Sequence, residues 1–330
     1  MSKLGIKKNT RSNAITYLIV IVAFVLFTIL SNGGVLGRKT VGLLVPACCY
    51  IVMAISLNLT VGILGELSLG HAGFMSVGAF AGVVASTGLS STITSAPLRL
   101  AVAMVIGALF AAIAGFLIGI PVLRLRGDYL AIVTLAFGEI IKEIISCLIV
   151  GTDEKGLHIV FNYNGAKTVD DLGLTPTGTA IIKGAQGATG TQTIASFTAG
   201  FVLIMVALVI VLNFVNSRSG RAVMAIRDNR IAAESVGINI TKYKMIAFTI
   251  SAAIAGAAGA LYGLNYSNIT SAKFDFNTSI LILVFVVLGG LGNIRGSIIA
   301  ATVLTVLPEM LRGLNDYRML IYAIILILVI

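Results

Sequence analysis

The chain has 330 residues, of which 58% are hydrophobic and only 11% are charged. Soluble globular proteins carry about 25% charged residues, so the composition excludes a water-soluble fold and indicates a protein with many membrane spans. The net charge of +10 is explained by basic loops that fix orientation in a membrane, and we expect no nucleic-acid partner. The three cysteines lie in apolar segments without a C-x-x-C spacing, which favours buried thiols over disulfides or a metal site.

Apolar segments long enough to cross a bilayer recur along the whole chain. A spanning helix needs about 20 apolar residues to cover about 30 Å of hydrocarbon. We therefore expect an all-α, polytopic integral membrane bundle of about ten transmembrane helices. The expected spans are 14–30, 40–64, 70–86, 98–121, 129–149, 197–215, 245–264, 280–292, 296–311 and 317–330.

The two ends of the chain are read from charge and length. Residues 1–11 carry four basic side chains and no cleavage site follows the first apolar run, which predicts an uncleaved first span and a cytoplasmic N-terminus. The last apolar segment, 317–330, is too short to cross a bilayer and the sequence stops inside it. We therefore expect the native protein to extend further.

Glycine-rich segments interrupt the apolar pattern twice, at 65–82 and at 289–296. We expect an irregular break at 66–68 before the third span and another after the eighth span. Glycines spaced as G-x-x-x-G, as at Gly78 and Gly82, allow membrane helices to touch.

Polar residues inside or beside the spans are candidates for the bundle interior or a transport pathway. Charges within a span are costly and normally face a bundle interior or water. Glu139 and Lys142 are three residues apart on one helix face and can pair; for their cluster we favour a structural role slightly over pathway lining. For His71 we favour a hydrogen-bonded turn over a substrate ligand. The candidates are Asn58, Glu66, His71, Glu139, Lys142 and Glu143.

Residues 217–244 form a polar, basic loop between two spans. Its excess of Lys and Arg marks the cytoplasmic side. Within it, Asp228 is a good helix N-cap and Gly237 suits the left-handed position that ends a helix, which predicts a short helix over 229–236. Small, apolar and acidic side chains on that helix favour a plug for a partner's groove. On this pattern alone, an ordinary surface helix is equally favoured.

The same loop resembles the coupling loop of the membrane subunits of ATP-binding-cassette (ABC) importers. Its GRA, AIR, IAAE, GI and YK elements, at 220–222, 225–227, 231–234, 237–238 and 243–244, are closest to LivM-type permeases of branched-chain amino acid importers. The SLGHA run at 68–72, the segment 124–140 and the glycine-rich run near 290 resemble that family too, so the likeness covers residues 48–312. The residues implied to contact an ATPase are Arg227, Asp228, Ile231, Ala232, Ala233, Glu234 and Gly237.

The resemblance also implies an assembly. We expect a single permease domain, 1–330, in a bacterial cytoplasmic membrane, with a homologous second permease, two cytoplasmic ATPases and an extracytoplasmic solute-binding protein. The implied cargo is leucine, isoleucine or valine, although related permeases carry urea, short amides or nucleosides. Residues 150–193 form one long outer loop with little periodicity, which we expect either to dock the binding protein or to act as a disordered linker.

Catalytic motifs are missing from the sequence. It contains no G-x-x-x-x-G-K-[ST] phosphate loop, and its two histidines are far apart. We therefore expect no enzyme activity, no cofactor and no metal, and an external energy source. An ion-coupled secondary transporter acting through the intramembrane charges is the alternative from another class, while no filter-like motif indicates a channel. The coupling loop favours the ABC importer.

Overall fold

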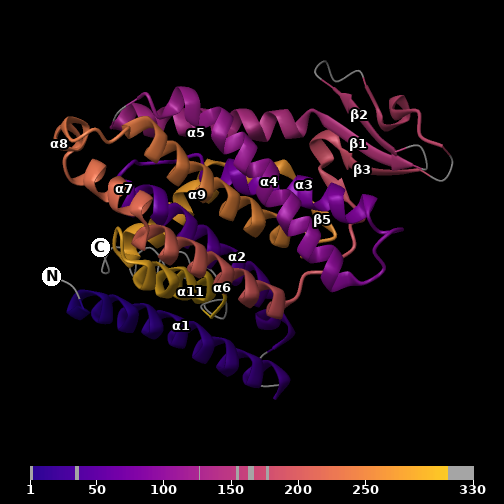
Figure 1. Ribbon diagram of the computed structural model, residues 1–330. Coiled ribbons are helices and arrows are strands. Elements are labelled where there is room, and N and C mark those ends of the chain that lie inside the picture. The colour runs from indigo at the N-terminus through magenta and orange to yellow at the C-terminus, as the bar shows by residue number, and fades with distance from the viewer. Residues whose placement is uncertain are drawn as a thin grey trace.

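The computed structural model describes residues 3–33, 37–125, 127–153, 156–162, 167–175 and 178–310. Helices dominate this part of the chain, and most of them run side by side between two ends of the molecule (Figure 1). The eleven α-helices are α1 (Lys3–Asn32), α2 (Arg38–Asn58), α3 (His71–Gly88), α4 (Ala96–Val122), α5 (Asp128–Ser146), α6 (Phe197–Asn216), α7 (Arg218–Asp228), α8 (Arg230–Ser235), α9 (Ile240–Gly263), α10 (Phe276–Gly289) and α11 (Ile294–Met310).

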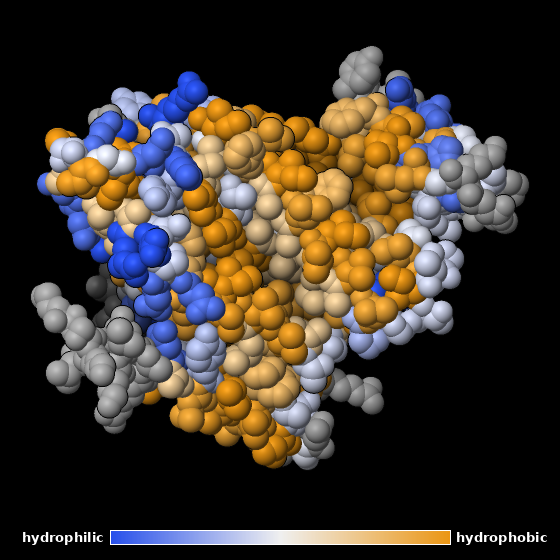
Figure 2. All heavy atoms as spheres, viewed as in Figure 1, coloured by the Kyte–Doolittle hydropathy of each residue, from blue (hydrophilic) through white to orange (hydrophobic). Residues whose placement is uncertain are grey.

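Each of the first nine predicted spans overlaps one of these helices, and the tenth, 317–330, lies outside the described residues. Among the described residues, five helical segments are long and apolar enough to cross a membrane: Asn13–Ser31, Thr40–Ile63, Ala96–Val122, Phe197–Asn216 and Ile240–Gly263. On the face shown in Figure 2, apolar side chains cover the middle, and hydrophilic ones gather at the α7–α8 end and, to a lesser extent, at the sheet end. The prediction of a polytopic helical membrane protein is confirmed.

The centre of the bundle is formed by α3, α4 and α9, which pack directly against one another. Glycines set the spacing. A Cβ on Gly78 would lie 2.0 Å from the Gly256 carbonyl oxygen, and a Cβ on Gly259 would lie 2.0 Å from the Met75 oxygen. Small residues of this kind let membrane helices approach to backbone contact. The three helices therefore have little freedom to slide past one another.

The two glycine-rich breaks are confirmed, and the second one contacts the π-helix that leads into the first. After α2 the chain continues as a π-helix (Leu59–Ile63) and then runs irregularly until α3 begins. The second break, at 290–293, separates α10 from α11 and holds Gly290 at φ +89° and Gly292 at φ +80°. A Cβ on Gly62 would lie 2.2 Å from the Gly292 nitrogen, so the π-helix that leads into the first break packs directly against the second break.

The segment 150–193 forms strands, so the alternative of a disordered linker is wrong, and docking of a binding protein stays a prediction. The segment contributes four strands to a five-stranded antiparallel sheet in the order β2-β1-β3-β4-β5. The sheet lies at the end of the molecule opposite α7 and α8 (Figure 1). Its strands are β1 (Leu148–Asp153), β2 (Gly156–Phe161), β3 (Thr179–Lys183), β4 (Ala188–Thr189) and β5 (Asn268–Ile269).

Burial explains why the strands escaped prediction. Consecutive residues are buried in β1 and in β3, as at Ile181 and Ile182, so the alternation of polar and apolar residues that marks a half-exposed strand is lost. The last strand comes from a distant part of the chain, where Ala188 pairs with Ile269. Because β1 begins at Leu148, α5 ends at Ser146 rather than at residue 149.

Candidate coupling site and the broken helices it contacts

The short helix predicted in the 217–244 loop is α8, and both of its ends are capped. The Asn229 side-chain oxygen accepts a hydrogen bond from the Ala232 nitrogen at 3.0 Å, which makes Asn229 the N-cap. Gly237 ends the helix region at φ +82°, so its predicted left-handed conformation is confirmed. The predicted N-cap, Asp228, is wrong, because α7 stays helical through that residue and the next one supplies the cap.

The exposed face of α8 is apolar with one carboxylate. Ile231 is 82% exposed and Val236 is 74% exposed, and Ala232 and Glu234 lie on the surface between them. Ala233 differs from the prediction: it is 4% exposed and packs against the chain's own residues 226 and 240. The helix thus rests on Ala233, while Ile231, Ala232 and Glu234 of the helix and Val236 directly after it lie on the surface.

Arg227 turns from the loop toward the two breaks. Its Nη1 donates a hydrogen bond to the Gly62 carbonyl oxygen at 2.9 Å. A Cβ on Gly65 would lie 2.6 Å from the Arg227 Cγ, and one on Gly292 would lie 3.9 Å from Nη1. The same guanidinium donates to Asp228 Oδ1 at 3.0 and 3.1 Å. Arg227 therefore joins the end of α7 to the region of the two breaks.

A second link runs from the start of α9 to the first break. Lys244 and Glu66 form an ion pair, and their side chains are only 4% and 13% exposed. Two charges that share a low-dielectric environment offset each other's cost of burial. The candidate residue Glu66 is therefore held against α9, close to the loop that carries α8.

Asn58 connects the first break to the second. Its Oδ1 accepts a hydrogen bond from the Gly292 nitrogen at 2.9 Å, and its Nδ2 donates to Ser297 Oγ at 2.7 Å. His71 lies deeper in the bundle, where its Nε2 is 2.8 Å from Ser56 Oγ. Both candidates are fully buried, and both belong to the bundle interior rather than to an open surface.

Comparison with known proteins identifies the family. Residues 39–330 match the family described as "Branched-chain amino acid transport system / permease component". This chain belongs to that family. The permease is 34% identical over 298 residues to the high-affinity branched-chain amino acid transport system permease protein LivM of Escherichia coli (strain K12), covering 88% of this chain and 68% of the relative.

Two other relatives match with lower identity or over less of the chain. A probable branched-chain amino acid transport permease protein LivM of Methanocaldococcus jannaschii is 26% identical over 277 residues, which is 75% of this chain and 74% of the relative. The LivH permease protein of Escherichia coli (strain K12) is 34% identical over 102 residues, or 31% of this chain and 32% of the relative. No solved structure matches the permease. Members of the family are transport components rather than enzymes.

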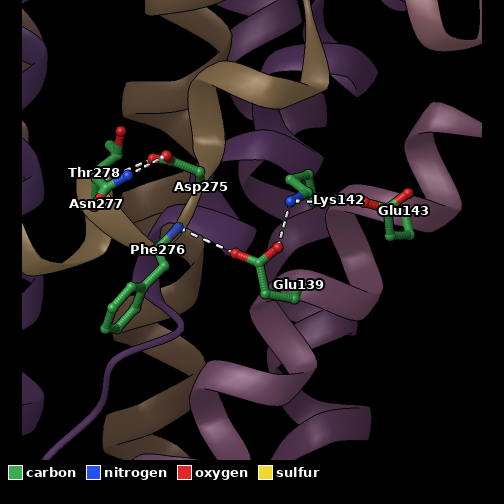
Figure 3. Close-up of polar contacts among 7 residues, drawn as sticks. All are labelled: Glu139, Lys142, Glu143, Asp275, Phe276, Asn277 and Thr278. Carbon is green, nitrogen blue, oxygen red and sulfur yellow. Dashed lines mark hydrogen bonds and ion pairs between the residues drawn. The ribbon is translucent and has the colours of Figure 1, made fainter.

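The charged residues of α5 lie beside the N-terminus of α10 (Figure 3). Lys142 forms the predicted ion pair with Glu139 and lies 3.6 Å from Glu143 Oε1. Glu139 Oε1 also accepts a hydrogen bond from the Phe276 nitrogen at 3.1 Å, so it satisfies a free donor at the start of α10. Glu143 is 68% exposed; its predicted position facing the bundle is wrong, because it lies on the opposite side of α5 from the packed residues.

Asp275 is a member of this cluster that sequence patterns missed. Its side chain caps α10 by accepting from the Thr278 nitrogen at 3.0 Å, and it also accepts from Asn277 Nδ2 at 2.8 Å. An aspartate directly before an apolar helix is the signal that would have found it. In the described part of the chain no group of three His, Cys, Asp or Glu side chains could hold a metal ion.

Proposed function

We propose that this permease carries branched-chain amino acids (leucine, isoleucine or valine) across the bacterial cytoplasmic membrane as one subunit of an ATP-driven importer. The observation that carries the proposal is the 34% identity over 88% of the chain to a LivM permease. We take residues 1–330 as a single transmembrane permease domain with a cytoplasmic N-terminus. Its 217–244 loop would be cytoplasmic and its 150–193 segment extracytoplasmic.

The partners follow from the proposed assembly. LivH proteins, which are permeases of the named transport system, share about a third of the chain's length with it, which supports a homologous second permease beside this one. Two cytoplasmic ATPases would supply energy, since the sequence has no phosphate loop of its own. An extracytoplasmic solute-binding protein would deliver the amino acid to the sheet end of the molecule.

The shape of α8 supports its role as the part that enters an ATPase groove. Ile231 and Val236 offer apolar area, Ala232 allows close approach, and Glu234 offers a single charge. Burying exposed apolar side chains of this size contributes about 1.5–3 kcal/mol each. A partner is the natural place for that burial, because Ile231 and Val236 are exposed while Ala233 is the residue of α8 that is buried in the permease.

Movement of α8 would reach the membrane part of the permease through the two links at the breaks. Arg227 donates a hydrogen bond to Gly62, and Lys244 forms an ion pair with Glu66. When the ATPases close, a shift of the loop would change the relative positions of α2 and α3 and, through Asn58, of α10 and α11. In this mechanism ATP hydrolysis opens the permease alternately to either side of the membrane.

The variant Glu234→Lys tests the coupling role. Like charges placed across an interface can cost several kcal/mol, and about 3 kcal/mol corresponds to about a hundredfold weaker binding. We expect the variant to insert and fold, to lose its ATPases during co-purification and to stop ATP-driven leucine uptake in proteoliposomes. Asp170→Lys makes the same change at an exposed position beside the sheet and should keep the ATPases. Normal ATPase binding and uptake by Glu234→Lys would contradict the proposal, and uptake driven by an ion gradient without ATP would favour a secondary transporter.

A further inference from the structure

A polar cavity of about 620 Å³ opens between the end of α3 and the sheet. We call it the outer pocket. Its polar lining comes from the last turn of α3, from β3, and from β4 and the segment that follows it. The lining side chains that matter here are Ser86, Thr87, Lys183, Thr189, Thr191 and Gln192.

The outer pocket carries a positive charge and no negative one among its described lining, although the Thr87 and Thr191 hydroxyls already donate to backbone carbonyl oxygens of the chain itself. No carboxylate is present among its described lining residues. Lys183 is half-buried and has no ion-pair partner among the described residues. The Thr189 hydroxyl is buried without a hydrogen-bond partner in the described part of the chain. Groups of this kind are costly to leave unsatisfied, so the pocket is matched to an anionic, acceptor-rich ligand.

A buried arginine outside the lining donates a hydrogen bond to one of the lining residues. Arg99 is only 6% exposed, and its Nη2 donates to Gln192 Oε1 at 2.6 Å. This bond occupies the amide oxygen of Gln192 and leaves its NH₂ group as the donor available to a ligand. The Arg99 Nε has no hydrogen-bond partner among the residues that the structure describes. Two cations, Arg99 and Lys183, therefore act on the pocket with no carboxylate in its described lining to balance them.

We propose that the outer pocket receives an aspartate or glutamate side chain of the solute-binding protein. The inference rests on the proposed function and adds the site and the chemistry of docking. A protein side chain fits better than the cargo, because the pocket lies against the sheet, which projects from the bundle at the end opposite α8 (Figure 1). Carboxylates bound by Lys or Arg form the stronger, charge-assisted class of hydrogen bonds.

The test is a titration of the whole transporter in proteoliposomes with purified, leucine-loaded binding protein, and the readout is stimulated ATP hydrolysis. For Lys183→Glu we expect the half-saturating concentration of binding protein to rise at least about tenfold, because the charge at the contact is reversed. The matched control is Lys167→Glu, which makes the same change at an exposed lysine of the same outer segment that does not line the pocket. It should stay within about twofold of wild type.

A second readout identifies the contact directly. A carbodiimide couples a carboxylate to a neighbouring lysine amine, so cross-linked wild-type complex should contain a peptide joining Lys183 to an acidic residue of the binding protein. Lys183→Arg keeps the positive charge but removes the amine. This variant should keep near-normal stimulation and lose the cross-link, as mass spectrometry would show.

Each remaining outcome overturns a different part of the reasoning. If Lys183→Glu and Lys167→Glu raise the half-saturating concentration of binding protein equally, the cause is the overall charge of this end of the molecule and not the pocket. If Lys183→Glu leaves that concentration unchanged, the pocket takes no part in docking. If Lys183→Glu leaves the binding-protein curve unchanged but raises the half-saturating leucine concentration for uptake, the pocket holds cargo and the inference is wrong. A wild-type transporter that shows no stimulation at all refutes the proposed function itself.

Discussion

Replacing Arg227 with alanine should uncouple ATP hydrolysis from transport without releasing the ATPases. The change removes the hydrogen bond from Nη1 to the Gly62 oxygen, 2.9 Å long, and the packing of the side chain on Gly65. The exposed face of α8 is untouched, since Arg227 points away from it toward the breaks. We therefore expect ATPase binding to persist.

The size of the effect follows from the two polar interactions that the substitution removes. A hydrogen bond from a charged donor contributes about 1.5–3 kcal/mol, and the 38% exposure of the Arg227 side chain places it near the lower limit. The ion pair with Asp228 is exposed on both sides and adds about 0–1 kcal/mol. A decrease of about 2 kcal/mol in coupling corresponds to about thirtyfold, which is within the usual range for linkage between two sites.

The assay is the number of leucine molecules taken up per ATP hydrolysed in proteoliposomes holding the whole transporter. We expect Arg227→Ala to lower this ratio by up to about thirtyfold, while the ATPases co-purify as with wild type. Arg218→Ala is the control, because Arg218 is exposed at the start of the same helix. An unchanged ratio in Arg227→Ala, or loss of the ATPases instead of the ratio, would refute the view that Arg227 transmits the movement.

Two glycine substitutions test the remaining structural arguments. Gly237→Ala forces a side chain into a backbone conformation with φ +82°, at a cost of about 1 kcal/mol. The affinity for the ATPases, measured by co-purification, should therefore fall about fivefold. Wild-type affinity would mean that the end of α8 is not part of the contact. Gly78→Ala places a Cβ 2.0 Å from the Gly256 oxygen. Because such overpacking costs about 1–3 kcal/mol, the detergent-solubilised variant should unfold at a lower temperature than wild type. Gly88→Ala, where a Cβ meets nothing within 4 Å, is the control for both, and equal melting of the Gly78 and Gly88 variants would contradict the close packing of α3 on α9.

The positions of the helices could be predicted because a bilayer imposes one strong rule on sequence. Apolar runs located nine helices, and glycines located both breaks. The start of α10 was less accurate. The eighth span was predicted to begin at residue 280, whereas α10 begins at Phe276 after its cap, Asp275, because the early residues of a capped helix need not be apolar.

The direction of individual side chains could not be predicted from the same patterns. In a helix of six residues the apolar set does not define one face, so Ala233 and Ile231 were both assigned to the partner. The structure buries Ala233 and exposes Ile231. Arg227 was assigned to the ATPase with its neighbours, because its contact with Gly62 joins residues 165 apart in the chain. Only the fold brings such residues together.

The contacts around the breaks determine which parts of the permease are able to move. Backbone contact at Gly78 and Gly259 leaves α3, α4 and α9 no room to slide, so these helices would shift as one body. The π-helical segment before the first break has a different hydrogen-bond pattern from the α2 helix that it extends, and such segments are frequent at functional sites. Arg227 and Lys244 both hold this region. Under the proposed coupling, movement of α8 would therefore change the irregular backbone at the breaks, while α3, α4 and α9 would shift together as a unit.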